Sequence, residues 1–222
     1  MNRISIVIPT LNEEKNIGAA IGEVKRVLRG YDYEIIVVDG HSRDSTVGIA
    51  KRAGARVIYD DYGKGSALIK GMHAARGGII ISMDADMSNK PEELKLLIAG
   101  IEAGYDVCVG SRFLVGGGSD DMPLVRKFGN KVFVMLVNLL YGSRYTDLCY
   151  GYRSFSRRAV RELRLREKGF GIETEMNILA QKKHMRILEV PSYEKRRANG
   201  EGKLQSLSDG WRILKTIVRN IS

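Results

Sequence analysis

The chain has 222 residues, enough for one sizeable hydrophobic core or for one domain with a small appendage. Its 44% hydrophobic and 28% charged residues are typical of a soluble globular protein. No apolar run reaches the ~18 residues that a membrane span needs, and the first apolar run is too short for a signal peptide. Two distant cysteines, Cys108 and Cys149, exclude a disulfide framework, and we expect both to be small buried hydrophobic residues in a reducing compartment.

The net charge of +10 is concentrated in the second half of the chain. Residues 1–120 contain 15 Lys and Arg against 16 Asp and Glu, whereas residues 121–222 contain 21 against 10. This asymmetry predicts either an anionic partner, such as a phosphate, a membrane surface or a nucleic acid, or a solvated basic surface.

The first 112 residues alternate strand and helix patterns. Short apolar runs predict buried strands, and apolar residues three and four positions apart predict helices between them. The strands are expected at 4–9, 33–40, 55–60, 79–86 and 105–112, and the helices at 12–28, 44–54, 63–77 and 91–104, with Asn12 as a cap of the first. The alternation predicts an α/β fold with a mainly parallel central sheet and helices on both faces.

Beyond residue 112 the pattern changes. We expect a loop at 114–123, a strongly apolar helix at 124–142, a basic helix at 157–169, a helix at 170–185 and a strand at 186–196. Residues 206–222 predict an amphipathic helix that carries on one face Trp211, Leu214, Ile217, Val218 and Ile221. The chain is therefore expected to be one continuous domain with two halves, 1–112 and 113–222.

Polar residues follow four of the predicted strands. Glu13 comes after the first strand, Asp39 ends the second, Asp84 and Asp86 end the fourth, and Arg112 ends the fifth. In open parallel sheets, ligands bind outside the carboxyl ends of the strands. The sequence thus predicts a site at this edge.

The Asp84-Ala85-Asp86 tripeptide is the first candidate for chemistry. Carboxylate oxygens suit Mg²⁺ or Mn²⁺, which are often bound by one or two carboxylates together with substrate phosphates. Alone, the tripeptide would more often be a polar turn, but its place at the predicted ligand edge favours a cation site.

Several basic residues are candidates for contact with phosphate. Lys64 lies between two glycines at the start of a predicted helix, in a loop that matches neither a Walker motif nor a G-x-G-x-x-G fingerprint. The others lie in or beside predicted loops, where an ordinary solvated role is the alternative: Arg112, Arg126, Arg153, Arg196, Arg197 and Lys203.

Six segments occur in the order and at the spacing of a known family. They are SIVIPTLNEEKNI, EIIVVDGHSRDST, GKGSALIKGMHAARG, ISMDADMSNKPEEL, VGSRF followed by GGG, and TDLCYGYRSF. Together they resemble the family 2 glycosyltransferases with the GT-A fold, over nearly the whole chain. The nearest branch is that of the polyprenyl-phosphate glycosyltransferases, similar to dolichol-phosphate mannose synthase.

The resemblance implies residue roles. Those implied for the nucleotide sugar are Pro9, Leu11, Glu13, Asp39, Lys64, Asp84, Ala85, Arg196, Arg197 and Lys203. Those implied for catalysis are Asp86, Asp147, Arg112 and Arg126, and those for a Mg²⁺ or Mn²⁺ cofactor are Asp86, Asp84 and Ser88. Asp86 is the more direct metal ligand, and Asp147 lines the acceptor side.

Three features depart from the family pattern. Some relatives carry a larger amide where this chain has Ser88, and "DLCYGY" stands where mannose synthases have "DxxSGF". Many relatives continue into transmembrane helices, whereas this sequence ends at Ser222.

The resemblance implies an inverting, metal-dependent hexosyltransferase. It would move a sugar from a GDP- or UDP-linked donor to a polyprenyl (dolichyl) phosphate at the cytoplasmic face of a membrane. Such a phosphate is ionised at pH 7 and needs no general base. The alternative is a hydroxyl acceptor in cell-surface polysaccharide synthesis, which needs a base; Asp147 is the first candidate, although it could equally cap a loop.

The basic second half fits a membrane partner. Helix 124–142 and the amphipathic C-terminus are expected either to rest on an anionic bilayer or to pack in the core. A membrane-anchoring partner and a homodimer are both compatible with this. A nucleotidylyltransferase would need a glycine-rich signature where the sequence reads PTLNEE. A nucleic-acid partner is not expected, because aromatic content is only 7% and no nucleic-acid-binding motif occurs.

Overall fold

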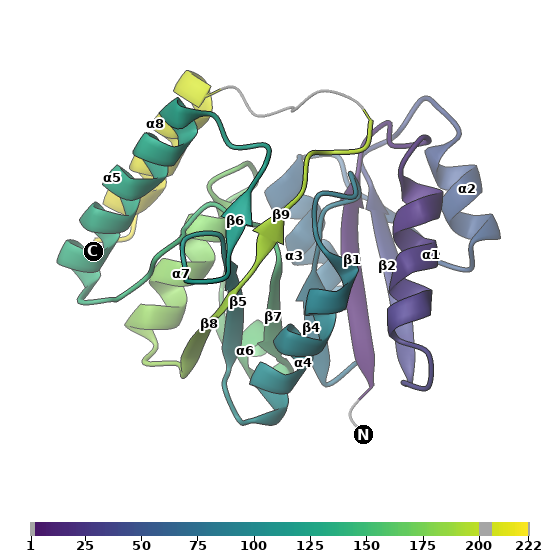
Figure 1. Cartoon of the computed structure of the whole chain (residues 1–222), viewed down its shortest axis with the longest axis horizontal. Helices are drawn as coiled ribbons and strands as arrows, with labels where there is room; N and C mark the ends of the chain where they lie inside the picture. The colour runs from purple at the N-terminus through teal and green to yellow at the C-terminus, as the bar shows by residue number, and fades with distance from the viewer. Residues whose placement is uncertain (1–2, 200–205, 222) are drawn as a thin grey trace.

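A seven-stranded sheet forms the centre of the computed structural model, which describes residues 3–199 and 206–221 (Figure 1). The strand order is β3-β2-β1-β4-β7-β5-β8, and β7 alone runs antiparallel to its neighbours. The strands are β1 (Ile4–Thr10), β2 (Tyr33–Asp39), β3 (Arg56–Tyr59), β4 (Ile79–Ser82), β5 (Val107–Ser111), β7 (Arg153–Ser156) and β8 (Ile187–Pro191). A second, two-stranded parallel sheet is formed by β6 (Gly118–Ser119) and β9 (Tyr193–Glu194).

Helices cover both faces of this sheet, as the alternating pattern predicted. Side chains of β1 alternate between the faces: Ile6 and Ile8 belong to one core, and Val7 belongs to the other. The first core is closed by α1 (Ile17–Val27), α2 (Thr46–Arg52) and α4 (Leu94–Glu102), the last preceded by a 3₁₀ turn at Pro91–Glu93. The second is closed by α3 (Lys64–Ala74), α6 (Arg157–Glu162) and α7 (Ile172–Lys182).

Two further helices lie at one end of the molecule (Figure 1). They are α5 (Leu124–Tyr141) and α8 (Ser206–Arg219), which pack against each other and against α7. Val137, Ile178 and Ile213 belong to the small apolar core between the three helices. In the described part of the chain, no helix is long and apolar enough to cross a membrane.

Several predicted boundaries were wrong. The first helix begins at Ile17, after a turn that contains Asn12 with φ 53°, so Asn12 is not its cap. The basic helix expected over 157–169 ends at Glu162. The late strand is two strands, β8 and β9, and the loop after residue 113 contains the short strand β6.

The strand β7 was missed altogether. Its buried residues Arg153 to Phe155 pair with β4 on one side and with β5 on the other. Because β7 is antiparallel, its first residue, Arg153, lies opposite Ser82, the last residue of β4. The segment Tyr150–Tyr152 therefore reaches the same sheet edge as the acids that follow β4.

Candidate active site

A cavity of about 820 Å³ opens at the carboxyl edge of the sheet. Its charged and polar side chains come mainly from the segments that follow β1, β3, β4 and β5, and we call this part of the wall the polar chamber. Its apolar side chains come mainly from α5, from α8 and from the segments before α5 and α7, and we call this part the apolar chamber: Met122, Val125, Phe128, Phe133, Phe170 and Ile213. A single cavity thus has both charged and apolar walls.

The Asp84-Ala85-Asp86 segment forms a tight turn in the polar half. The backbone N–H of Asp84 donates to Asn89 Oδ1 (2.8 Å), and that of Ser88 donates to Asp86 Oδ1 (3.1 Å). Met87 takes a left-handed conformation, φ 67°, that closes the turn. Burial and the neighbouring charge of Asp84 raise the pKa of Asp86 above its ordinary value.

These acids fit a divalent cation. Carboxylates are hard oxygen donors that Mg²⁺ and Mn²⁺ prefer, and such an ion would offset the cost of a charged Asp86 beside Asp84. The described residues hold no ready cluster of three or more His, Cys, Asp or Glu side chains arranged around a metal. The remaining ligands would have to be water or phosphate oxygens.

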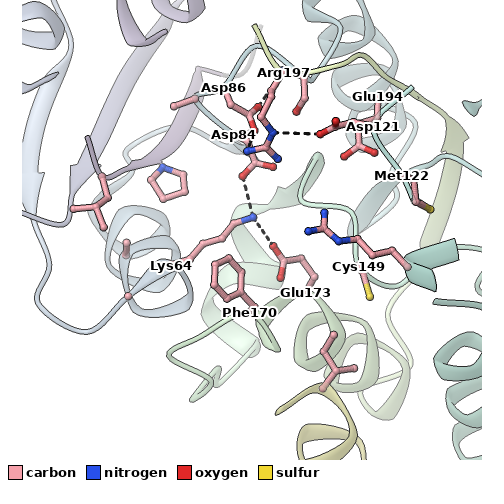
Figure 2. A pocket seen from close by; sticks show the side chains of 18 of the residues that line it. Lys64, Asp84, Asp86, Asp121, Met122, Cys149, Phe170, Glu173, Glu194 and Arg197 are labelled. Carbon is pink, nitrogen blue, oxygen red and sulfur yellow. Dashed lines mark hydrogen bonds and ion pairs between the residues drawn. The ribbon is translucent and has the colours of Figure 1, made fainter. Parts of the chain in front are cut away.

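Lys64 lies between two acids, as Figure 2 shows. Its Nζ is 2.9 Å from Asp84 Oδ1 and 3.1 Å from Glu173 Oε1 on α7. Although burial lowers the pKa of Lys64, the two carboxylates more than offset this and raise it above its ordinary value. The lysine is held in place because the backbone N–H of Gly65 donates to Lys168 O (2.9 Å).

Arg197 approaches the acidic turn from the opposite side (Figure 2). Its Nη1 is 3.6 Å from Asp86 Oδ2, and its Nε donates to Asp121 Oδ2 at 3.2 Å. Backbone hydrogen bonds bind its segment to the turn, from Lys195 N to Ser88 O (2.8 Å) and from Ala198 N to Asp86 O (3.2 Å). The segment that follows β9 therefore lies directly against the turn that contains Asp84 and Asp86.

Arg112 forms ion pairs with two carboxylates. Its Nε and Nη2 donate to the two oxygens of Asp147 (2.7 and 3.0 Å), and its Nη1 donates to Glu194 (3.1 Å). The Asp147 side chain is 0% exposed, and that of Arg112 is 9% exposed. This pair is thus a buried bidentate ion pair that joins β5 to the loop before β7.

The other predicted residues divide into two groups. Six more line the cavity: Pro9, Leu11, Glu13, Ala85, Ser88 and Arg126. Asp39 is fully buried and accepts hydrogen bonds from Thr10 and Ser42, and neither Asp39 nor Asp147 is among the described residues of the cavity wall. Arg196 is exposed outside that wall, and Lys203 lies outside the described residues.

The sequence patterns did not identify three acids of the site. Glu173, Asp121 and Glu194 all line the cavity and contact its basic side chains. Glu173 lies in the first turn of α7, where an acid is usual, so its position carried no functional signal.

The two cysteines lie in different environments. Cys108 is buried in the sheet, whereas Cys149 is half-buried at the cavity wall.

Comparison with known proteins places this geometry in a family. Residues 5–164 match the model described as glycosyl transferase family 2. The dolichol-phosphate mannosyltransferase of Pyrococcus furiosus is 33% identical over 91% of this chain, which spans only 59% of that protein. The dolichyl-phosphate hexose transferase of Haloferax volcanii is 32% identical over 97% of this chain and 92% of its own.

A solved structure shows the same architecture. The glucosyl-3-phosphoglycerate synthase of Mycobacterium tuberculosis, crystallised with Mn²⁺, UDP and phosphoglyceric acid, matches with a TM-score of 0.80. The two chains are 22% identical, and the match covers 100% of this chain and 79% of the other. The fold is therefore GT-A, as expected, and the chain belongs to glycosyl transferase family 2.

Proposed function

We propose that the protein transfers a hexosyl group, with inversion, from a nucleotide-diphosphate sugar to a polyprenyl phosphate. The observation that carries this proposal is the wall of the cavity, which combines a charged part with an apolar part. A polyprenyl phosphate has the matching two parts, an ionised head and an apolar tail. The names of the Pyrococcus and Haloferax relatives, both transferases to dolichyl phosphate, support the same acceptor class.

The polar chamber would bind the donor. Asp86 and Asp84 would hold a Mg²⁺ or Mn²⁺ ion, which when bound supplies positive charge against the leaving diphosphate. Lys64 and Arg197 lie on either side of these acids and would contact the same phosphates. Preorganised cations at the place where negative charge develops are an effective way to lower such a barrier.

The apolar chamber would bind the acceptor. Val125 and Phe128 line it and are also 70% and 71% exposed, so the chamber opens onto the surface of α5. A lipid tail could enter there with its phosphate directed at the acidic turn. An ionised phosphate attacks without a general base, and the two oxygens of Asp147 are already occupied by Arg112.

We further propose that α5 and α8 rest on an anionic bilayer. Large apolar side chains are exposed on both helices: Leu124, Phe128, Met135, Leu139, Trp211 and Val218. All charged residues of α5 are basic, and the only described acid of α8, Asp209, is 3% exposed and paired with Arg212. Apolar and basic side chains together are typical of helices that lie in a membrane interface.

A donor and acceptor screen tests the reaction. UDP- and GDP-linked hexoses would be incubated with Mn²⁺ and either polyprenyl phosphate or the corresponding polyprenol. We expect one donor to give a glycosyl phospholipid and the alcohol to give none. Transfer only to hydroxyl acceptors would overturn the proposal.

The same assay tests the metal role. Because the cation stabilises the leaving diphosphate, Asp86→Asn should lower kcat/KM by about two orders of magnitude or more. Asp32→Asn, which removes an exposed acid outside the described cavity wall, is the control and should retain most activity. Full activity of Asp86→Asn would contradict the metal assignment.

A further inference from the structure

Both acids of the turn after β4 are already paired with a basic side chain from a distant element. Lys64 meets Asp84 at 2.9 Å, and Arg197 meets Asp86 at 3.6 Å. Each basic residue also contacts a second acid across the cavity, Glu173 for Lys64 and Asp121 for Arg197. Protein cations therefore already balance the charge of both acids that would hold a metal.

The two pairs differ in how firmly they are held. Lys64 is at the start of α3 and makes two contacts near 3 Å. Arg197 lies outside regular structure, and its hydrogen bond goes to Asp121 rather than to Asp86. The contact between Arg197 and Asp86 is the more easily broken of the two.

A divalent cation would compete with Arg197 for Asp86. Inner-sphere Mg²⁺ lies about 2.0–2.1 Å from its oxygen ligands, so it would take a lone pair of the carboxylate, and its charge would repel the guanidinium. Arg197 would keep Asp121 as a counter-ion after it leaves Asp86. It would then lie beside the diphosphate that arrives with the metal.

Resting on the proposed function, we infer that Arg197 is an exchangeable counter-ion of Asp86. It pairs with the carboxylate of Asp86 when no divalent cation is bound, gives way to that cation, and moves to the donor diphosphate. Arg197 thereby makes metal binding weaker when no nucleotide is present and stronger when a nucleotide is present. It is a positioning residue that couples the two ligands, and such coupling is reciprocal.

Direct measurement of Mn²⁺ binding tests this inference. The free-Mn²⁺ signal in electron paramagnetic resonance would give the Kd of Mn²⁺ for the full chain, with and without UDP or GDP. Without nucleotide, Arg197→Gln should tighten Mn²⁺ binding by about two- to fivefold, the equivalent of a partly exposed ion pair. With nucleotide, the gain in Mn²⁺ affinity should be smaller in this variant than in the unmodified protein.

Two variants separate the pairing from general charge effects. Arg196→Gln removes the same charge from the neighbouring exposed position and should change Mn²⁺ affinity by less than Arg197→Gln does. Arg197→Lys keeps a cation and should lie between Arg197→Gln and the unmodified protein. Thermal unfolding would show that all of them are folded.

The outcomes are distinct. Equal effects of Arg196→Gln and Arg197→Gln, or weaker Mn²⁺ binding by Arg197→Gln without nucleotide, would overturn the exchange while leaving the proposed reaction intact. An unmodified protein that binds no Mn²⁺ under any of these conditions would overturn both the exchange and the metal role.

Discussion

Asp147 was a candidate for chemistry in the sequence, but in the structure it holds other parts of the site in place. As an acid on the acceptor side it was the first candidate for a general base. In the structure its carboxylate is 0% exposed and accepts two hydrogen bonds from the guanidinium of Arg112. The pair fixes Arg112 over the ring of Tyr150, 4.7 Å away, and so joins β5 to the segment before β7. Position along the chain could not distinguish these roles, because the partner is 35 residues away.

Replacing Asp147 with Asn should therefore mainly lower the free energy of unfolding. Removing one partner of a buried ion pair typically costs about 3–5 kcal/mol, and here Arg112 would keep only Glu194 as a counter-ion. We expect denaturant titration to show a loss of this size in the free energy of unfolding. Glu23→Gln, which breaks the exposed pair with Arg26, is the control and should leave unfolding nearly unchanged. A fully stable Asp147→Asn variant with no transferase activity would instead support a role in the reaction.

At the scale of elements, a strand could be predicted when the residues of that strand themselves carry the pattern. The five parallel strands at the start of the chain were predicted because each carries its own apolar run and turn residues. Strand β7 was not, since RSFS is short and has the polar pattern of a loop. It becomes a strand because backbone groups of β4 and β5 lie on both sides of it. For the same reason, the contacts of Glu173 and Asp121 with Lys64 and Arg197 required the assembled fold.

The loop that starts α3 gives a test at this scale. A Cβ added to Gly65 would lie 2.4 Å from the backbone oxygen of Glu167, so the segment before α7 would have to move away from Lys64. Gly65→Ala should destabilise the fold by about 1–3 kcal/mol and raise KM for the donor. Gly22→Ala is the matched control: nothing lies within 4 Å of its added Cβ, and alanine is favoured inside the helix α1. Equal stability of the two variants would show that the close approach at Gly65 is not constraining.

At the scale of the whole molecule, the structure shows where helices of the basic second half of the chain lie. The basic second half includes α5 and α8, which lie together at one end of the structure, and α5 borders the apolar chamber of the cavity (Figure 1). An enzyme that takes its acceptor from a bilayer would have to present this end to the lipid. Val125 and Phe128 on α5 are both exposed and part of the cavity wall, so the surface proposed to face the lipid is continuous with the apolar chamber.

Vesicle binding tests this orientation. Co-sedimentation with anionic phosphatidylglycerol vesicles should be strong, and binding to neutral vesicles should be weak. Lys127 and Lys131 are exposed on α5, and each lysine near an anionic surface contributes about 1 kcal/mol, so replacing both with Gln should weaken binding by about 30-fold. Lys51→Gln/Arg52→Gln on α2 removes the same charge from an exposed helix outside the proposed contact and should have little effect. If both double variants lost binding equally, attraction would come from net charge alone, and the protein would have no preferred face toward the membrane.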